Sequence, residues 1–145
     1  YSSLVARPLG RFRWVTCASP DYLREYGVPP SPEALSQHRA VHYFSGQARR
    51  ADEFRFVRHG ETFSVPVSGN AAVNETGLYI KMCLAGFGLA QLAENIVADH
   101  LQEGRLVEVL TDWQPPPVPV TLLYPHQRFL SPAVRAFAEW MSEVV

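Results

Sequence analysis

The chain has 145 residues and a mass of 16.3 kDa, which fits one ordinary domain or at most two small lobes. Hydrophobic residues make up 47% of it and charged residues 19%, a balance that excludes bulk disorder. The formal net charge is −1, so the chain lacks the excess positive charge that binding to the DNA backbone requires and is not expected to bind DNA by itself. No apolar run approaches the roughly 20 residues of a membrane-spanning helix.

The first part of the chain alternates strand and helix signals. Residues 11–18 are dense in aromatic and β-branched side chains and predict a strand. The sequence Ser-Pro-Asp at 19–21 then predicts a helix, because serine caps the N-terminus, proline fits the first turn and aspartate suits the positive end. Gly27 ends that helix. A second Ser-Pro start predicts a short helix over 31–38, and 40–44 predicts a strand.

The middle of the chain predicts a hairpin followed by a buried helix. Residues 54–58 and 62–68 alternate apolar and polar side chains around His59-Gly60-Glu61. Residues 75–85 predict a helix that is apolar nearly all round and is therefore expected to be buried. Gly86-Phe87-Gly88 breaks it, and 89–92 predicts a short buried strand.

The last third continues the alternation, which argues for an α/β fold. A helix over 95–102, strands over 105–110 and 120–124, and a final helix from Ser131-Pro132 are predicted. Strands at 12–18 and 120–124 bracket about a hundred residues that could close as one unit, which suggests two lobes. The final helix places its apolar residues at spacings of three and four, and we expect that face to be buried: Val134, Phe137, Met141 and Val144.

Most patterns that would indicate catalysis or a metal are lacking. His38 and His42 have helical ligand spacing, but His42 falls in a predicted strand, where four residues span about 13 Å. Gly86-x-Gly88 follows a helix and has Gln91 in place of the third glycine of a dinucleotide fingerprint. There is no nucleophile elbow, P-loop or paired-carboxylate motif. We therefore expect no enzyme, no metal and no cofactor.

Two features concern single residues. Cys17 and Cys83 each lie in an apolar stretch, so we expect two buried, reduced and poorly reactive thiols. Asn74 and Ser19 each follow an extended run and are predicted N-caps, and a helix N-terminus after a strand can hold a ligand carboxylate. Plain capping remains the alternative for both. Glu75 weakens an anion site at its terminus, because a carboxylate already occupies the positive end.

A set of short segments occurs in one order along the whole chain. The first are Leu4-Val5-Ala6-Arg7-Pro8-Leu9-Gly10, Arg13-Trp14-Val15 and Cys17-Ala18-Ser19-Pro20-Asp21-Tyr22-Leu23. The later ones are His38-Arg39, Tyr43, Val67-Ser68-Gly69-Asn70, Val73-Asn74-Glu75, Leu84-Ala85-Gly86-Phe87-Gly88-Leu89-Ala90, Gly104-Arg105-Leu106-Val107, Asp112-Trp113, Tyr124-Pro125 and Leu130-Ser131-Pro132. In this order and spacing they resemble the effector-binding domain of a LysR-type transcriptional regulator.

The resemblance implies an α/β fold like that of the type 2 periplasmic binding proteins, with two lobes joined by two hinge strands. By it, residues 1–18 are the end of the first lobe and the first hinge strand, with the crossing strand at 13–18. Residues 19–119 are the second lobe, and 120–145 are the second hinge strand and a helix returning to the first lobe. The resemblance also implies that most of the first lobe and a helix-turn-helix domain lie upstream of Tyr1. The family usually has a proline where Ala93 stands.

The implied function is a bacterial, cytoplasmic sensing domain that binds a small-molecule co-inducer between its lobes. We expect a carboxylate or an aromatic ligand, a homo-oligomer (dimer or tetramer), DNA binding only through the missing domain, and no membrane contact. The alternative is a transporter's solute-binding protein of the same fold, and the start of the intact gene would separate the two. The expected effector-binding residues are Ala18, Ser19, Tyr43, Asn74, Phe87 and Gly88.

Overall fold

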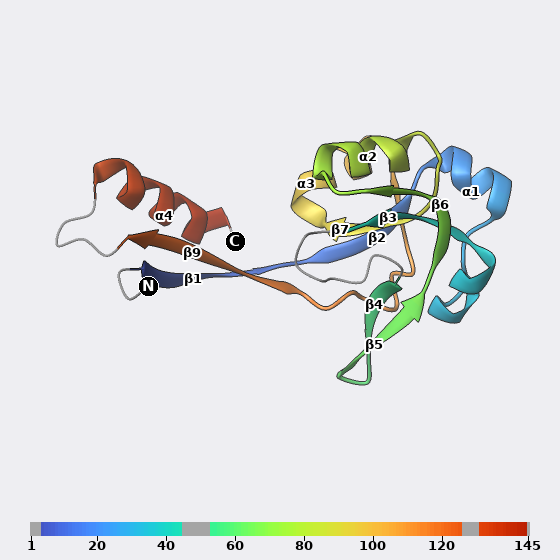
Figure 1. Cartoon of the computed structure of the whole chain (residues 1–145), viewed down its shortest axis with the longest axis horizontal. Helices are drawn as coiled ribbons and strands as arrows, with labels where there is room; N and C mark the ends of the chain where they lie inside the picture. Colours follow the sequence, from blue (N-terminus) through green and yellow to red (C-terminus); the bar gives the residue numbers. More distant parts are fainter. Residues whose placement is uncertain (1–3, 45–52, 126–130, 145) are drawn as a thin grey trace. The chain divides into compact units, whose positions relative to one another are not determined.

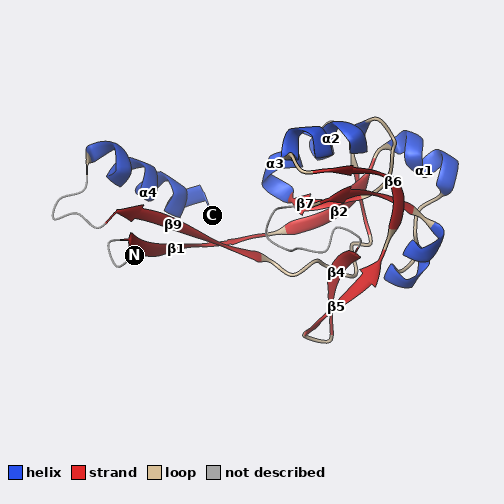
Figure 2. Cartoon of the chain, viewed as in Figure 1, coloured by secondary structure: helices blue, strands red, loops and turns tan. Residues whose placement is uncertain are grey.

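The computed structural model describes residues 4–44, 53–125 and 131–144. The chain divides into two compact units, a smaller one made of Tyr1–Phe12 with Pro117–Val145 and a larger one made of Arg13–Pro116. Figure 1 labels the helices and strands in chain order, and Figure 2 distinguishes them by type.

The smaller unit contains two long paired strands and one helix. Strand β1 (Leu4–Phe12) runs antiparallel to β9 (Val118–Pro125), with one irregularity of register between Pro8 and Gly10. Helix α4 (Pro132–Val144) begins after Ser131, whose hydroxyl accepts from the Val134 amide at 3.3 Å.

Helix α4 forms where it is expected, but its apolar face is not buried. Val134 and Met141 are half-buried and Phe137 is 49% exposed, whereas Val144 lies outside the described side chains. The ring of Phe137 instead contacts that of Trp140, with centroids 6.2 Å apart. Periodicity identifies the apolar face correctly, but burying it requires neighbouring elements, and among the described residues α4 has its main contacts with β1.

The larger unit is built on a three-stranded antiparallel sheet in the order β7-β2-β8. Strand β2 (Trp14–Ala18) lies between β7 (Ala90–Ala93) and β8 (Val107–Val109). The single strand predicted over 11–18 is in fact divided at Arg13, where the chain passes from one unit to the other.

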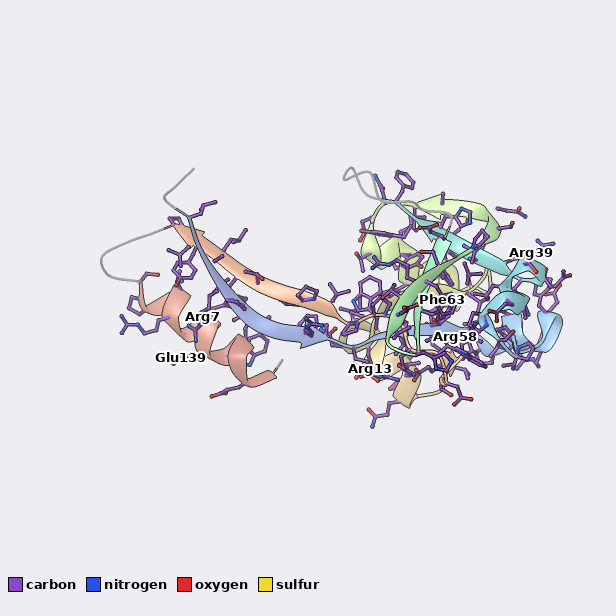
Figure 3. All side chains as sticks on the ribbon, turned by 90° about the horizontal axis from the view of Figure 1, so that it is seen from below. Arg7, Arg13, Arg39, Arg58, Phe63 and Glu139 are labelled. Carbon is purple, nitrogen blue, oxygen red and sulfur yellow. The ribbon has the colours of Figure 1, made fainter. Side chains whose placement is uncertain are left out.

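Two further strand pairs complete the larger unit. Strand β3 (Arg39–Tyr43) pairs in parallel with β6 (Ser68–Val73) and touches the β7 segment through a parallel bridge between Ala40 and Leu89. Strands β4 (Glu53–Arg58) and β5 (Glu61–Pro66) form the predicted hairpin, and His59 and Gly60 turn it with positive φ. Figure 3 labels Arg58 and Phe63, and the Arg58 guanidinium lies 4.7 Å from the centre of the Phe63 ring.

Four helical segments surround these strands. Helix α1 (Pro20–Tyr26) has the predicted caps, since Ser19 Oγ accepts from the Tyr22 amide at 3.1 Å and Gly27 has a φ of +83°. The others are the 3-10 helix η1 (Pro32–Gln37), α2 (Thr76–Leu84) and α3 (Glu94–Gln102).

Two expectations about α2 are wrong. The helix is not buried all round: Tyr79 and Cys83 face the core, whereas Leu78 is 46% exposed, because only one side packs on β3, β6 and β7. Its N-cap is Glu75 rather than Asn74, since the Glu75 carboxylate accepts from the Gly77 and Leu78 amides at 2.5 and 3.1 Å. A cap needs a side chain that reaches back to these amides, and Asn74 lies one residue too early.

The core of the larger unit consists of two clusters. One includes Ala18, Tyr22, Leu35, Phe54, Phe56 and Leu89; the other includes Val15, Cys17, Val41, Tyr79, Cys83, Ala90, Leu92 and Val97. Cys17 and Cys83 are free and buried, as predicted. The neighbouring Cys17 and burial raise the pKa of the Cys83 thiol, which supports the expectation of low reactivity.

Candidate ligand pocket

The larger unit holds a pocket of about 290 Å³. Strands β2, β3, β4 and β7 and helices α2 and α3 contribute to its wall. The lining residues are Trp14, Tyr43, Glu53, Phe54, Thr76, Tyr79, Gln91, Leu92, Ala93 and Ile96.

The sheet register explains why residues so distant in sequence meet here. Trp14, the first residue of β2, lies opposite Ala93, the last of β7. Tyr43, the last residue of β3, lies beside Val73, the last of β6, after which the chain enters α2. The carboxyl ends of β3, β6 and β7 therefore converge where two helices begin, which is the usual place for a ligand crevice in an α/β fold.

Aromatic side chains form much of the wall. The rings of Tyr43 and Tyr79 lie 5.2 Å apart at an interplanar angle of 50°. Phe54 is buried in the core beneath the pocket, and Trp14 is half-buried at its edge. Apolar lining with a few polar groups is typical of sites for small organic molecules.

Gln91 is the most buried polar side chain of the wall, and its amide group is engaged within the protein. Its Oε1 accepts from the backbone N–H of Arg55 at 3.0 Å. Its Nε2 donates to Thr16 Oγ1 at 3.1 Å and to the Arg55 carbonyl at 2.9 Å. Gln91 thus ties β7 to β2 and β4 and holds the pocket wall together rather than offering its amide to a ligand.

Three lining residues carry a hydroxyl group: Tyr43, Thr76 and Tyr79. The backbone N–H of Gln91 donates to Tyr79 Oη at 2.9 Å, so the Tyr79 hydroxyl already has a hydrogen-bond partner within the protein. Within residues 4–44, 53–125 and 131–144, the hydroxyls of Tyr43 and Thr76 have no hydrogen-bond partner. They are the groups through which a ligand's polar atoms can be recognised.

The residues predicted for effector binding lie at two ends of the larger unit. Tyr43 lines the pocket, and Asn74 is exposed just before Thr76, a lining residue. Ala18 is the last residue of β2 and Ser19 follows it, at the opposite end of the strand from Trp14, about 13 Å of extended chain away. Because Cys17 pairs with Ala90, the preceding turn, with exposed Phe87 and buried Gly88, lies at that far end too.

The far end is close-packed. A Cβ on Gly86, which has a φ of +87°, would lie 3.6 Å from Ser19 Oγ. A Cβ on Gly88 would lie only 2.9 Å from backbone atoms of Arg39 and Ala40. Ser19 is itself 2% exposed and caps α1. Gly86 and Gly88 therefore meet steric requirements of the backbone, and Ser19 caps helix α1.

Sequence reasoning missed most of the pocket wall, including Trp14, Glu53, Thr76 and Gln91. One usable signal was the buried glutamine in an apolar strand, because a polar side chain there needs partners from other elements. No group of three or more potential metal-ligating side chains occurs among the described residues. Among those residues, every helix is too short or too polar to cross a membrane.

Comparison with known proteins decides the family. The family model described as the LysR substrate binding domain matches residues 1–145. The chain belongs to this family. It is 36% identical over 143 residues to the HTH-type transcriptional repressor PA14_22550 of Pseudomonas aeruginosa, covering 99% of this chain and 45% of that protein. It is 34% identical over 142 residues to the HTH-type transcriptional regulator YhjC of Escherichia coli K12, covering 98% and 48%. This LysR substrate-binding domain thus spans about half the length of the curated relatives it matches.

Solved structures agree. The full-length virulence activator AphB of Vibrio cholerae, a member of the LysR-type family, has a TM-score of 0.76 at 27% identity, covering 99% of this chain and 49% of that one. The regulatory domain of CrgA from Neisseria meningitidis shares the fold with a TM-score of 0.82 at 24% identity, covering 98% and 69%. The fold is the periplasmic-binding-protein-like type 2 fold. The relatives are transcriptional regulators, which favours the regulator over the transporter alternative.

Proposed function

We propose that this domain senses a small organic effector for a bacterial LysR-type transcriptional regulator, and that the effector binds in the pocket of the larger unit. The observation that carries the proposal is the pocket itself. It has a volume of about 290 Å³, mainly apolar and aromatic walls, and the hydroxyls of Tyr43 and Thr76, which have no hydrogen-bond partner among the described residues. That combination is typical of a small-molecule site.

The rest of the proposal concerns the whole protein. It would bind DNA through a helix-turn-helix domain that precedes this chain, act as a homo-oligomer (dimer or tetramer) in the cytoplasm, and catalyse no reaction. Its relatives are named HTH-type regulators, and this chain matches about half of their length, which leaves room for such a domain. The boundaries 1–18, 19–119 and 120–145 belong to this proposal as well.

Among the predicted effector residues, Tyr43 is the one that the pocket favours, and Asn74 lies beside its rim. The expectation that Ala18, Ser19, Phe87 and Gly88 bind effector stays a prediction.

The experiment blocks the pocket from an exposed position. Thr76 is exposed on the first turn of α2 and lines the pocket, so Thr76→Trp should obstruct the site while the helix still forms. The matched control is Lys81→Trp, which places the same side chain on an exposed position of α2 outside the lining. A library of small organic molecules is first screened for thermal stabilisation of the unmodified domain.

Compounds that stabilise the unmodified domain and the Lys81→Trp variant, but not Thr76→Trp, support the proposal. A complete regulator carrying Thr76→Trp should then no longer respond to the same compound at its promoter. Equal stabilisation of all three proteins would place the site elsewhere, and a screen without any stabilising compound would count against a ligand-sensing role.

A further inference from the structure

We propose that Tyr79 is a positioning residue that keeps the pocket open, because its hydroxyl holds strands β3 and β7 apart. The inference rests on the proposed function, since it concerns the pocket as the effector site. It gives Tyr79 a role in setting the shape of that site, beyond lining it.

Strands β3 and β7 begin as neighbours in a parallel ladder. The backbone N–H of Leu89 donates to the Arg39 carbonyl, and the backbone N–H of Val41 donates to the Leu89 carbonyl, both at 2.9 Å. Hydrogen bonds in a parallel ladder are evenly spaced, two residues apart along each strand. The next bond of a regular ladder would therefore join the Gln91 N–H to the Val41 carbonyl.

That next bond is replaced by one to a side chain. The backbone N–H of Gln91 donates to Tyr79 Oη at 2.9 Å, in a buried position. Helix α2, which carries Tyr79, packs on both β3 and β7 (Figure 1). The Tyr79 hydroxyl thus stands in for the Val41 carbonyl, and the bridge at Leu89 is isolated rather than the start of a longer ladder.

The pocket lies where the two strands part. Tyr43, Tyr79 and Gln91 all line it, and the rings of Tyr43 and Tyr79 have centroids 5.2 Å apart. A continued ladder would go on to join the Tyr43 N–H to the Gln91 carbonyl. Closing β3 onto β7 would therefore bring two lining residues together and narrow the pocket.

The side chain of Gln91 secures the β7 side of this opening. It forms hydrogen bonds with Thr16 on β2 and with the backbone of Arg55 on β4. Gln91 is thus held from both its backbone and its side chain, and β3 is the strand that is free to approach when the bond to Tyr79 is lost.

Tyr22 offers a matched control, because its hydroxyl accepts the same kind of bond at the other end of β3. The backbone N–H of Arg39 donates to Tyr22 Oη at 2.9 Å. Tyr22 and Tyr79 are 1% and 4% exposed, and Tyr22 lies outside the pocket lining. Tyr22→Phe and Tyr79→Phe therefore each remove one buried hydroxyl that accepts from the backbone, but only the second does so at the pocket.

The first measurement is binding of 2-phenylethanol, a probe that carries an aromatic ring and a hydroxyl to match the wall. Titrations are followed by NMR through the methyl groups of three lining residues, Thr76, Leu92 and Ile96. Tyr79→Phe should raise the dissociation constant about tenfold or more, and Tyr22→Phe by less than about twofold. Urea denaturation of both variants compares their stabilities, so that a general loss of stability is separated from an effect on the pocket.

The second measurement detects the closing of the strands. NMR can record the scalar coupling across a hydrogen bond between the Gln91 amide nitrogen and the Val41 carbonyl carbon. The coupling should be absent in the unmodified chain and in Tyr22→Phe, and it should appear in Tyr79→Phe. A purely structural role for Tyr79 would lower stability without creating this bond.

The inference is overturned if Tyr79→Phe binds the probe as tightly as Tyr22→Phe, if the coupling to Val41 does not appear, or if the probe does not bind the unmodified chain. The proposed function is decided separately, by the library screen and the Thr76→Trp variant. A compound that stabilises the unmodified chain and Tyr79→Phe equally, but not Thr76→Trp, would keep the pocket as the effector site and reject the role of Tyr79.

Discussion

The two units of this chain use similar elements with different results. In the larger unit several strands and helices converge, and two clusters of side chains are buried. In the smaller unit Leu9 is the buried hydrophobic residue among the described positions, while large apolar side chains stay exposed: Leu4, Leu123, Phe137 and Trp140. The helix of the smaller unit is more amphipathic than α2 and α3, but two strands and one helix cannot enclose a core.

The comparison shows that an apolar face and a buried face are different properties. Helix α4 has a clear helical period of apolar residues and still exposes 55% of Trp140. Strand β2 has an apolar centre and buries Val15 and Cys17 completely, because it has a strand on each side and helices over it. Burial depends on how many elements meet at a position.

The most direct way to break this comparison is to shorten one phenylalanine in each unit. Phe56 is fully buried in the larger unit, so Phe56→Ala should lower the free energy of unfolding by about 3–5 kcal/mol. Phe137 is 49% exposed, so Phe137→Ala should cost less than about 1 kcal/mol. Urea denaturation of both variants measures the difference. Similar losses for the two would mean that Phe137 is covered in solution.

A second test concerns how closely the strands of the larger unit approach one another. A Cβ on Gly69 of β6 would lie 1.8 Å from the Ala40 carbonyl oxygen on β3. Gly69→Ala must therefore push the two strands apart, and we expect a loss of about 2–4 kcal/mol. Gly104→Ala is the control, because it has a φ of +77° but open space, and it should cost about 1–2 kcal/mol. If both variants have the same denaturation midpoint, the close approach of β3 and β6 is not what requires glycine.

A third test uses pH to probe one polar contact of the larger unit. Tyr22 Oη accepts from the backbone N–H of Arg39 at 2.9 Å and lies 2.8 Å from His38 Nδ1, to which its hydroxyl can donate. Nδ1 can accept only while the imidazole is neutral, and burial lowers the pKa of His38 below its ordinary value of 6.5. This contribution to stability is complete above pH 6.5 and is lost as the pH falls through the lowered pKa.

Unfolding experiments between pH 7 and pH 5 should therefore show a stability that decreases toward acid. His38→Gln should flatten that dependence, since the amide does not titrate. A decrease of equal size in the His38→Gln variant would assign the effect to other groups.

The smallest expected effect is a gain in stability. Ala93 has a φ of −65°, the angle that proline adopts, and the preceding Leu92 is extended in β7. The Glu94 amide donates to the Arg13 carbonyl, so in the alternating antiparallel pattern Ala93 and Trp14 form a pair without hydrogen bonds between them. Ala93→Pro should stabilise the chain by about 0.4–1 kcal/mol in thermal denaturation. A loss of stability would show that the Ala93 amide has a partner.

Local signals predicted the elements well. Helix caps and tight turns depend on a few adjacent residues. The structure confirms the predicted N-cap at Ser19, the helix end at Gly27 and the hairpin turn at residues 59–60. The division of the first strand at Arg13 and the one-sided burial of α2 depend on elements far away in the sequence. No local pattern contains that information, so these predictions were wrong. The assignment of the α2 cap to Asn74 was a local error of one residue, since Glu75 is the N-cap.

The site was less accessible to prediction, for the same reason. Tyr43 was included through the family resemblance, but Trp14, Glu53 and Gln91 come from three strands that only the register brings together. Asn74 and Ser19 share a strand-then-helix pattern, yet the structure places one beside the pocket and the other at the far end of β2. A local motif can identify a helix start, but it does not show which end of the sheet that start occupies.

The pairing of β1 with β9 has a mechanical consequence. Phe12 lies opposite Val118, so the chain enters and leaves Arg13–Pro116 through neighbouring positions, while Leu4 pairs with Pro125 at the opposite end. A force that pulls Leu4 and Pro125 apart would separate the two strands one residue pair at a time from that end. The hydrogen bonds lie across the strands, so each pair bears the force alone before the next one opens. The larger unit would bear none of that force until the last pair, Phe12 with Val118, has separated. The same closed ends would let it be transplanted as a single loop into the turn of another hairpin.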